Sequence, residues 1–424
     1  MALRILAAQP SPQLLTLPWR LPLERWPDDC QVPLARGISR HVVRFVRVDH
    51  QVYAAKETRE AWAWREYGTL RNLRRLGLPT VEPVGVVTGR QTETGAQLEP
   101  CLLTRHLAHS LPYRALFSQR LQPDTVTRVV DALVVLLVRL HVAGFWWGDC
   151  SLSNTLFRRS AGEFAAYLVD AETGELHEQL TAGQRAHDLD LVTTNVFGEL
   201  LDLQAGKLLD EHLDPAEMVT RVQERYDVLW EALTGAEEFN TEQMWRIEQR
   251  VQQLNSLGFD VEELDIVTDF DGATVRIQPA VVEAGHHARR LQGLTGLDVE
   301  ELQARRLLND LDAFTVAADL QGEDPTIVAH RWLTEVYEPL WAMVPATLRN
   351  RLEPAELFHE VLEHRWYLSE RGGQEVDLFD AAAAYIDDML PARSQTLSGV
   401  QPTAGSELEP ALGTDDDLVE RVDR

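Results

Sequence analysis

Residues 140–154, which read LHVAGFWWGDCSLSN, and the short run Tyr167-Leu168-Val169-Asp170 decide the fold of this chain. The first stretch follows a long apolar segment that is typical of a buried helix. The second has the pattern of a strand that ends on a carboxylate. Asp149 and Asn154, five residues apart, therefore lie on a loop, and Asp170 lies at the end of a strand. We expect these three side chains to form one polar site.

The three side chains are the polar groups that phosphoryl transfer requires. Asp149 is the candidate base, which orients the attacking hydroxyl and accepts its proton. Asn154 and Asp170 are candidate ligands of the Mg²⁺ that bridges the phosphates of ATP. A bare D-x-x-x-x-N pattern is common by chance, so the prediction depends on the loop and strand around it. The alternative reading is a turn aspartate, a capping asparagine and a surface aspartate.

Lys56 ends a Val-x-Ala-Ala-Lys strand, where its ammonium group can reach the α- and β-phosphates. Its expected partner is Glu66 on the following helix, with Glu60 as second choice. A lysine at a strand end is usually a solvated edge residue, but together with the downstream polar groups it favours a nucleotide site. The loop that would cover the phosphates, residues 35–40, offers Gly37, Ser39 and Arg40.

The order of the predicted elements is that of a two-lobed kinase. Strands are expected within residues 38–57, 84–88 and 101–104, with a helix over residues 61–76 between them. A long helix runs from residue 123 to 140, a hairpin covers residues 155–169, and helices follow from residue 186. The predicted fold class is α+β, with a β-rich N-lobe and a helical C-lobe. An α-rich accessory domain with a small hairpin at residues 263–268 and 273–277 follows.

A chain of 424 residues predicts two or three domains. We expect an N-terminal arm over residues 1–30, the N-lobe over 31–110, the C-lobe over 111–235 and the α-rich domain over 236–393. Residues 1–36 are rich in proline and leucine and predict an irregular or packed arm. Residues 394–424 are rich in Ser, Thr, Gly, Pro and acidic residues, which predicts a disordered acidic tail.

The composition restricts the classes of partner. The formal charge is −27, which argues against nucleic acid and anionic membranes as bulk partners. The longest apolar run, residues 132–138, is too short to span a membrane. The three widely separated cysteines fit neither a disulfide framework nor a zinc site. We therefore predict a cytoplasmic protein with no membrane span.

The pattern from Leu140-His141 through Gly144-Phe145 and Gly148-Asp149 to Asn154 resembles the catalytic segment of small-molecule kinases. The similarity is to the lipopolysaccharide kinase and aminoglycoside phosphotransferase families, and it covers roughly residues 30–235. The Arg65-Glu66 region is similar to their second helix. The resemblance implies a bilobal protein-kinase-like fold that uses ATP and Mg²⁺. It also implies roles for five residues: Lys56 and Glu66 as the ion pair, Asp149 as the base, and Asn154 and Asp170 as metal ligands.

Three positions depart from the pattern of those families. Trp147 stands where they carry a histidine two residues before the catalytic aspartate. Asp170 is followed by Ala171-Glu172, which keeps the ligand and adds a carboxylate. The loop at residues 35–40 has one glycine, Gly37, rather than three. These departures bear on the rate of catalysis more than on nucleotide binding.

The acceptor class follows from the short segment between Asp170 and Asp188. About seventeen residues separate them and no Ala-Pro-Glu follows, which leaves little room to dock a peptide. A small-molecule or sugar hydroxyl is the predicted acceptor. Asp188 is either an aspartate that braces the catalytic loop or a helix-start acid. The other functions left open are a nucleotide-binding pseudokinase and an AMP transferase that uses the same site.

The run from His364 to Glu370, HRWYLSE, resembles an uncharacterised bacterial family. Its members join a lipopolysaccharide-kinase-like domain to a C-terminal domain of unknown function, and the resemblance implies no activity for that domain. Residues 260–393 are the predicted surface for a protein partner. Trp366 and Tyr367 are expected to be core aromatic residues, with an interaction surface as the second choice.

Overall fold

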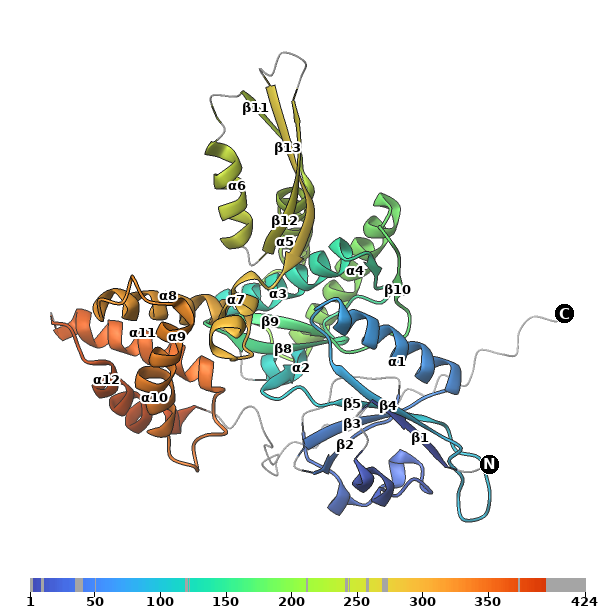
Figure 1. The fold of residues 1–424 in the computed structure, drawn as a ribbon. Helices are drawn as coiled ribbons and strands as arrows, with labels where there is room; N and C mark the ends of the chain where they lie inside the picture. The colour runs from blue at the N-terminus through green and yellow to red at the C-terminus, as the bar shows by residue number, and fades with distance from the viewer. Residues whose placement is uncertain are drawn as a thin grey trace.

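A strand-rich lobe, a helical lobe and a separate helical body make up the fold (Figure 1). The computed structural model describes residues 3–393, apart from residues 9–10, 35–40, 50, 119–120, 122, 211–212, 241–242, 244, 257–258, 269–273 and 373. Gly37, Ser39 and Arg40 therefore lie outside the described residues, as do the predicted tail at 394–424 and residues 269–272, which join the two strands of the predicted small hairpin.

The N-lobe is built on a five-stranded antiparallel sheet. Its order is β1-β4-β5-β3-β2, and it contains β1 (Arg4–Ala7), β2 (Val43–Val48), β3 (Gln51–Glu57), β4 (Glu82–Thr88) and β5 (Cys101–Arg105). The predicted hairpin is confirmed, since β2 pairs with β3 so that Val43 faces Lys56. Lys56 also pairs with Leu102 of β5, so it lies between two neighbouring strands.

The helix α1 (Glu60–Arg75) packs against this sheet. Its buried residues Ala63, Tyr67 and Leu70 recur at helical spacing, and Glu66 lies on the same face. The helix ends before Gly77, which adopts a φ of 68° that favours glycine. The burial of this face is the reason that Glu66, and not the exposed Glu60, points to the sheet.

The N-terminal segment is packed, and it contains a strand that the sequence analysis missed. Three short 3₁₀ turns, η1 (Pro12–Thr16), η2 (Leu23–Arg25) and η3 (Asp28–Cys30), place Trp19 and Trp26 in the N-lobe core. The buried Arg90 donates to the carbonyl oxygens of Trp19 and Leu21 and so anchors the segment. The missed strand β1 has only four residues, and none of them is buried. So short a strand offers too few positions for an apolar alternation to be recognised.

The C-lobe is organised around α3 (Pro123–Val142), whose buried residues run from Val126 to His141. It contacts β9 (Glu163–Leu168), which forms a small sheet with β8 (Thr155–Ser160) and β6 (Ser110–Pro112). The remaining elements are α2 (Tyr113–Phe117), β7 (Phe145–Trp146), β10 (Glu175–Leu176), α4 (Ala182–Ala205) and α5 (Pro215–Thr234). Helix α4 begins earlier than predicted because Thr181 and Gln184 form a capping box.

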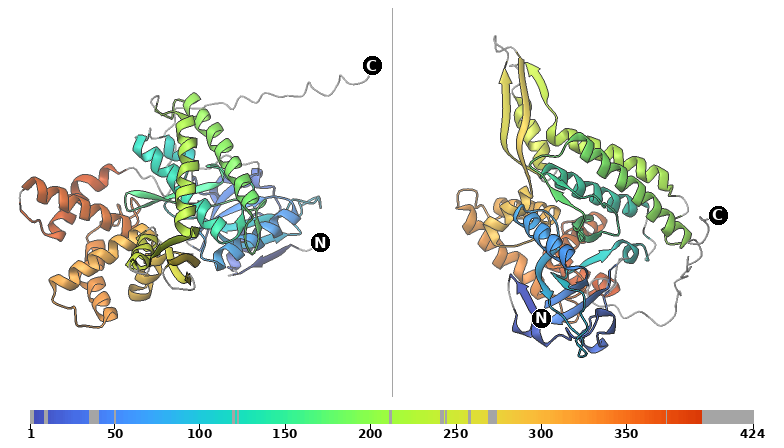
Figure 2. Two further views of the ribbon diagram at one scale, coloured as in Figure 1. Left: turned by 90° about the horizontal axis from the view of Figure 1, so that it is seen from above. Right: turned by 90° about the vertical axis from the view of Figure 1, so that its right-hand side faces the viewer.

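A long hairpin projects away from the C-lobe (Figures 1 and 2). Its strands β12 (Phe259–Thr268) and β13 (Thr274–Ala284) are longer than the predicted hairpin, and β11 (Glu237–Asn240) pairs with β13. Helix α6 (Trp245–Ser256) lies beside them. Leu254 and Phe259 share the hydrophobic core of the C-lobe. The division of the chain at residue 235 remains a proposal.

The helical body has its own hydrophobic core around Trp332, Tyr337 and Phe358. It consists of α7 (His286–Thr295), α8 (Glu301–Ala317), α9 (Pro325–Trp332), η5 (Leu333–Tyr337), α10 (Glu338–Ala342), α11 (Pro354–Gly372), α12 (Leu378–Ala384), η6 (Tyr385–Met389) and η7 (Leu390–Ala392). The predicted core positions of Trp366 and Tyr367 are wrong, since 66% and 51% of these residues are exposed. The inner face of α11 carries other residues, such as Phe358, so its aromatic pair points outward.

A polar contact joins the helical body to the β8–β9 hairpin. Arg158 of β8 forms ion pairs with Glu300, at 3.1 Å, and with Glu353. The Tyr167 hydroxyl donates to Glu300 at 2.6 Å, and the amide of Ala161 donates to Glu356 at 2.8 Å. The helical body is therefore held against the C-lobe mainly by partly buried charges.

No helix in the described part of the chain is both long enough and apolar enough to cross a membrane.

We expect Arg158→Met to lower the free energy of unfolding by about 3–5 kcal/mol, because it leaves two partly buried carboxylates without their cation. Chemical denaturation followed by circular dichroism measures this change. The matched control is Arg159→Met, at the exposed neighbouring position, which we expect to be nearly neutral. Equal effects of the two substitutions would contradict the stabilising role of the Arg158 ion pairs.

Candidate active site

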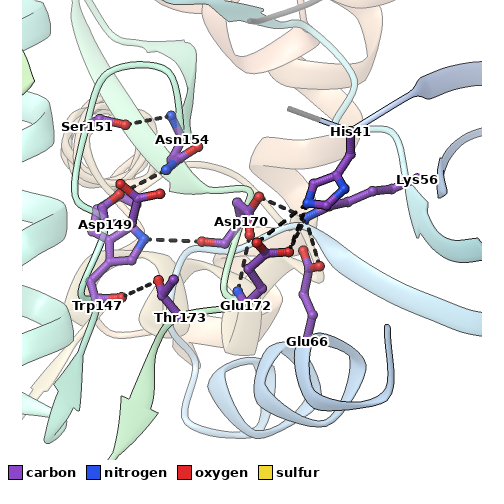
Figure 3. Close-up of polar contacts among 10 residues, drawn as sticks. All are labelled: His41, Lys56, Glu66, Trp147, Asp149, Ser151, Asn154, Asp170, Glu172 and Thr173. Carbon is purple, nitrogen blue, oxygen red and sulfur yellow. Dashed lines mark hydrogen bonds and ion pairs between the residues drawn. The ribbon is translucent and has the colours of Figure 1, made fainter. Parts of the chain in front are cut away.

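Three segments that are distant in sequence meet at Lys56 (Figure 3). Its Nζ lies 3.0 Å from Glu66 on α1, 2.8 Å from Asp170 after β9 and 3.3 Å from Glu172. The predicted Lys56–Glu66 contact is thus present, and Glu60 takes no part in it. His41 adds a contact to Glu172 at 3.2 Å. One cation therefore lies among three carboxyl groups.

Burial and neighbouring charges shift the pKa values of Lys56 and Glu66. Burial by itself lowers the pKa of Lys56, but the charges of Glu66 and Asp170 outweigh it and raise the pKa above its ordinary value. For Glu66, burial and then the charge of Asp170 raise the pKa to about 8. Lys56 is therefore charged at neutral pH.

The loop that carries Asp149 is held in place by hydrogen bonds to a buried aspartate. Asp188 of α4 accepts hydrogen bonds from the amides of Trp147, at 2.7 Å, and Gly148, at 2.8 Å. The ring of His141 contacts the same carboxylate at 3.1 Å and the Tyr226 hydroxyl at 2.7 Å. The prediction that Asp188 braces this loop is confirmed. Because its side chain is fully buried, the loop position is strongly determined.

A second carboxylate supports the loop, and the sequence analysis did not identify it. Glu199 of α4 accepts hydrogen bonds from the amides of Leu152, at 2.9 Å, and Ser153, at 2.8 Å. Burial raises the pKa of Glu199, and the hydrogen bonds from Ser153 oppose that rise. Its position on α4, three helical turns after Asp188, is the signal that could have indicated a second support for the loop.

Asp149 and Asn154 lie side by side on the loop, opposite Lys56 (Figure 3). The side-chain amide of Asn154 donates to the carbonyl oxygen of Asp149 at 2.9 Å, and its backbone amide donates to Ser151 Oγ at 3.2 Å. Since its NH₂ group is occupied in this way, Asn154 can present its amide oxygen to a ligand.

Trp147 connects this loop to Asp170. Its side chain is fully buried, and its indole N–H donates to the Asp170 carbonyl oxygen at 3.2 Å. The Glu172 amide donates to Asp170 Oδ1 at 3.1 Å. The residue that departs from the expected histidine thus helps to position the carboxylate of Asp170.

The oxygen atoms at this site suit Mg²⁺. Among the described residues, Glu66, Asp170 and Glu172 form the one group of acidic ligand atoms that lie within 4.8 Å of one another. Lys56 contacts all three, so this group already contains a cation. The fit for Mg²⁺ rests on Asp170 and Asn154, which offer carboxylate and amide oxygens, the ligands that Mg²⁺ prefers.

Cys150, next to Asp149, is fully buried. Burial raises the pKa of its thiol well above the ordinary value, and the charges of Asp188 and Glu199 add to the rise. The structure indicates a small packing residue rather than a nucleophile.

Comparisons with known proteins give two family matches. Residues 43–197 match the lipopolysaccharide kinase (Kdo/WaaP) family, and residues 228–390 match a domain of unknown function, DUF4032. A solved structure described as WaaP in complex with acyl carrier protein is similar at 20% identity, with a TM-score of 0.32. The similarity covers 53% of this chain and 99% of that chain. No curated protein matches the chain.

The family matches confirm the predicted resemblance to lipopolysaccharide kinases, followed by a domain of unknown function. Lys56, Glu66, Asp149, Asn154 and Asp170 all lie within the matched residues 43–197. The match supports a kinase-like phosphotransferase. The roles of these residues and of Gly37, Ser39 and Arg40 remain predictions.

We expect Gly144→Ala to destabilise the loop. Gly144 has a φ of 79°, and a Cβ there would lie 2.2 Å from the carbonyl oxygen of His177. The left-handed backbone alone costs about 1–2 kcal/mol for a residue with a side chain. The measurement is the thermal unfolding midpoint. Gly68→Ala in α1 is the control, because a Cβ there meets nothing within 4 Å, and we expect it to be neutral or stabilising.

We also expect only Cys30 to react with a thiol reagent in the native protein at neutral pH. Cys101 and Cys150 are buried, and Cys30 is half-exposed. Ellman's reagent should detect all three thiols only after unfolding in guanidinium chloride, and Cys30→Ser should remove the native reaction. Rapid native labelling of Cys150 would contradict its role as a packing residue.

Proposed function

We propose that this chain is an ATP- and Mg²⁺-dependent phosphotransferase that acts on a hydroxyl group of a small molecule or a sugar. The observation that carries the proposal is the contact of Lys56 with both Glu66 and Asp170, opposite a braced loop with Asp149 and Asn154. The lipopolysaccharide kinase match supports the coarser statement of a kinase-like phosphotransferase.

The nucleotide site is assigned to Lys56, Asp170 and Asn154. Lys56 offers a charged ammonium group to the α- and β-phosphates, and the Glu66 contact on α1 fixes its direction. Asp170 and Asn154 would hold Mg²⁺, which supplies positive charge against the phosphate oxygens when it is bound. Gly37, Ser39 and Arg40 are proposed to cover the phosphates, and they lie outside the described residues.

Asp149 is the proposed base. Its carboxylate accepts a hydrogen bond from the acceptor hydroxyl and so orients the oxygen toward the γ-phosphorus. As the new oxygen–phosphorus bond forms, the bond to the leaving oxygen of ADP breaks and the hydroxyl proton passes to Asp149. Asp188 and Glu199 hold the loop that carries this carboxylate, since both accept hydrogen bonds from loop amides.

The short segment after Asp170 supports a small acceptor. It contains Thr173, which donates to the carbonyl oxygen of Trp147 at 3.0 Å, and the two-residue strand β10, which pairs with β7. Helix α4 then begins at Ala182. The segment is tied to the catalytic loop along its length, so little backbone remains on which a peptide substrate could dock.

A nucleotide-binding pseudokinase is the second candidate, and Glu172 is the observation that favours it. The carboxylate of Glu172 contacts the ammonium group of Lys56 at 3.3 Å. This is the cation that the proposed site offers to the phosphate groups of a nucleotide. A nucleotide must compete with this contact, because phosphate and carboxylate repel each other. In that case the chain binds nucleotide without turnover, and residues 260–393 engage a protein partner.

We expect Mg-ATP to bind to the wild type, to bind at least about tenfold more weakly to Asp170→Asn, and to bind with unchanged affinity to Asp149→Asn. Loss of a charged ligand weakens nucleotide binding, whereas loss of the base lowers turnover by about 10²–10⁴-fold. Isothermal titration calorimetry measures binding, and labelled phosphate transfer to extract metabolites measures turnover.

Three outcomes separate the candidates. Binding with turnover that Asp149→Asn removes supports the phosphotransferase. Binding without transfer to any acceptor supports the pseudokinase. A product that gains the mass of AMP, detected by mass spectrometry, identifies an AMP transferase. Absence of Mg-ATP binding by the wild type would contradict all three.

A further inference from the structure

A cavity of about 350 Å³ lies between the C-lobe and the start of the helical body, apart from the site described above. Its walls come from α3, α5, the β8–β9 hairpin, the first residue of β12 and residues 300–302 around the start of α8. These elements converge at the centre of the molecule in Figure 1. The volume is within the range of sites that bind small molecules.

Three arginines line this cavity. Arg128 and Arg139 belong to one face of α3, and Arg225 comes from α5. The Nε atoms of Arg139 and Arg225 are buried and have no hydrogen-bond partner. Within the described ranges, neither guanidinium group forms an ion pair, whereas Arg128 lies 3.7 Å from Glu163. Two cations therefore line the cavity without a direct ion pair, and Arg139 interacts with the charges of Glu300 and Glu301 only at longer range.

The acidic residues of the lining are engaged elsewhere. Asp131 pairs with Arg221 at 2.9 Å, and Glu300 pairs with Arg158 at 3.1 Å. Glu301 accepts hydrogen bonds from the amides of His287, at 2.9 Å, and Ala288, at 3.0 Å. None of these carboxylates forms an ion pair with Arg139 or Arg225, although Glu300 and Glu301 still attract Arg139 at longer range.

A half-buried guanidinium group without a partner is costly. Burial lowers the pKa of Arg139, and the charges of Tyr167, Glu301 and Glu300 oppose this shift only in part. An anion in the cavity removes this cost, because two guanidinium groups can each donate a pair of hydrogen bonds to phosphate or carboxylate oxygens. The site is therefore already arranged for a ligand of opposite charge.

We infer that this cavity binds a small phosphate monoester with an apolar substituent. Two unpaired cations match a phosphate group, which carries close to two negative charges at neutral pH. The rest of the wall is largely apolar and includes Val135, Leu229 and Phe259, which favours a hydrophobic substituent over a free inorganic ion. The bound ligand touches both the C-lobe and residues 300–302, so it strengthens the contact between the C-lobe and the helical body.

Phenyl phosphate is the probe, and calorimetry on the full chain is the measurement. We expect saturable binding by the wild type, and at least about tenfold weaker binding by Arg139→Met and by Arg225→Met, since each loses hydrogen bonds between charged groups. Benzyl alcohol, which lacks the charge, should not bind, and benzoate should bind more weakly than phenyl phosphate. Arg331→Met, at an exposed position on α9, is the matched control and should bind as the wild type does.

The variant Lys56→Met distinguishes this cavity from the proposed nucleotide site. We expect it to keep the full affinity for phenyl phosphate, whatever its effect on Mg-ATP. Loss of phenyl phosphate binding in Lys56→Met would place the probe in the nucleotide site and overturn the inference. Absence of saturable binding by the wild type, or unchanged affinity in Arg139→Met, would also overturn it.

Thermal unfolding without ligand gives an independent readout. Arg139→Met should raise the unfolding midpoint of the ligand-free protein, because it removes an unpaired charge from a partly buried position. It should also abolish the rise that phenyl phosphate produces in the wild type. A lower midpoint for ligand-free Arg139→Met would show that the guanidinium group stabilises the fold itself and would contradict an anion site.

Discussion

The ion cluster at Lys56 is the interaction on which the arrangement of the two lobes depends. It joins β3, α1 and the segment after β9 through one ammonium group, with contacts of 3.0 Å to Glu66 and 2.8 Å to Asp170. Such a cation among carboxylates is stable only while all partners keep their positions, since each buried charge needs the others. The contacts that join the lobes also place Lys56, the proposed phosphate contact, beside Asp170, the proposed metal ligand.

The loop between α3 and β8 shows how an irregular segment is made rigid. Its amides cannot pair within a helix or a sheet, so side-chain carboxylates accept their hydrogen bonds. Asp188 and Glu199 perform this task from a single helix, α4. Trp147 extends the network to Asp170 through its indole N–H. The position of the proposed base is thus determined by acidic residues that take no direct part in the proposed chemistry.

The helical body meets the C-lobe through charged and polar groups rather than through an apolar interface. Arg158 and Glu300 are partners across this contact, and Gln303 donates to the Arg159 carbonyl oxygen at 3.3 Å. Polar contacts of this kind specify one orientation, because a shifted orientation leaves charges unpaired. The β8–β9 hairpin makes these contacts, and its second strand, β9, leads directly to Asp170. A single strand therefore connects the helical body with the proposed site.

Local patterns were sufficient to predict the motif from Leu140 to Asn154, the strand that ends at Lys56 and the order of strands and helices. Hydrophobic period and turn chemistry act over a few neighbouring residues, so they can be read directly from the chain. The support from Glu199 and the exposure of Trp366 depend instead on which surfaces face each other after folding. The unpaired Arg139 and Arg225 belong to the same class, because a charge is known to lack a partner only when every residue around it has been placed. Tertiary packing alone decides such contacts, since their partners are separated by tens of residues and no local pattern relates them.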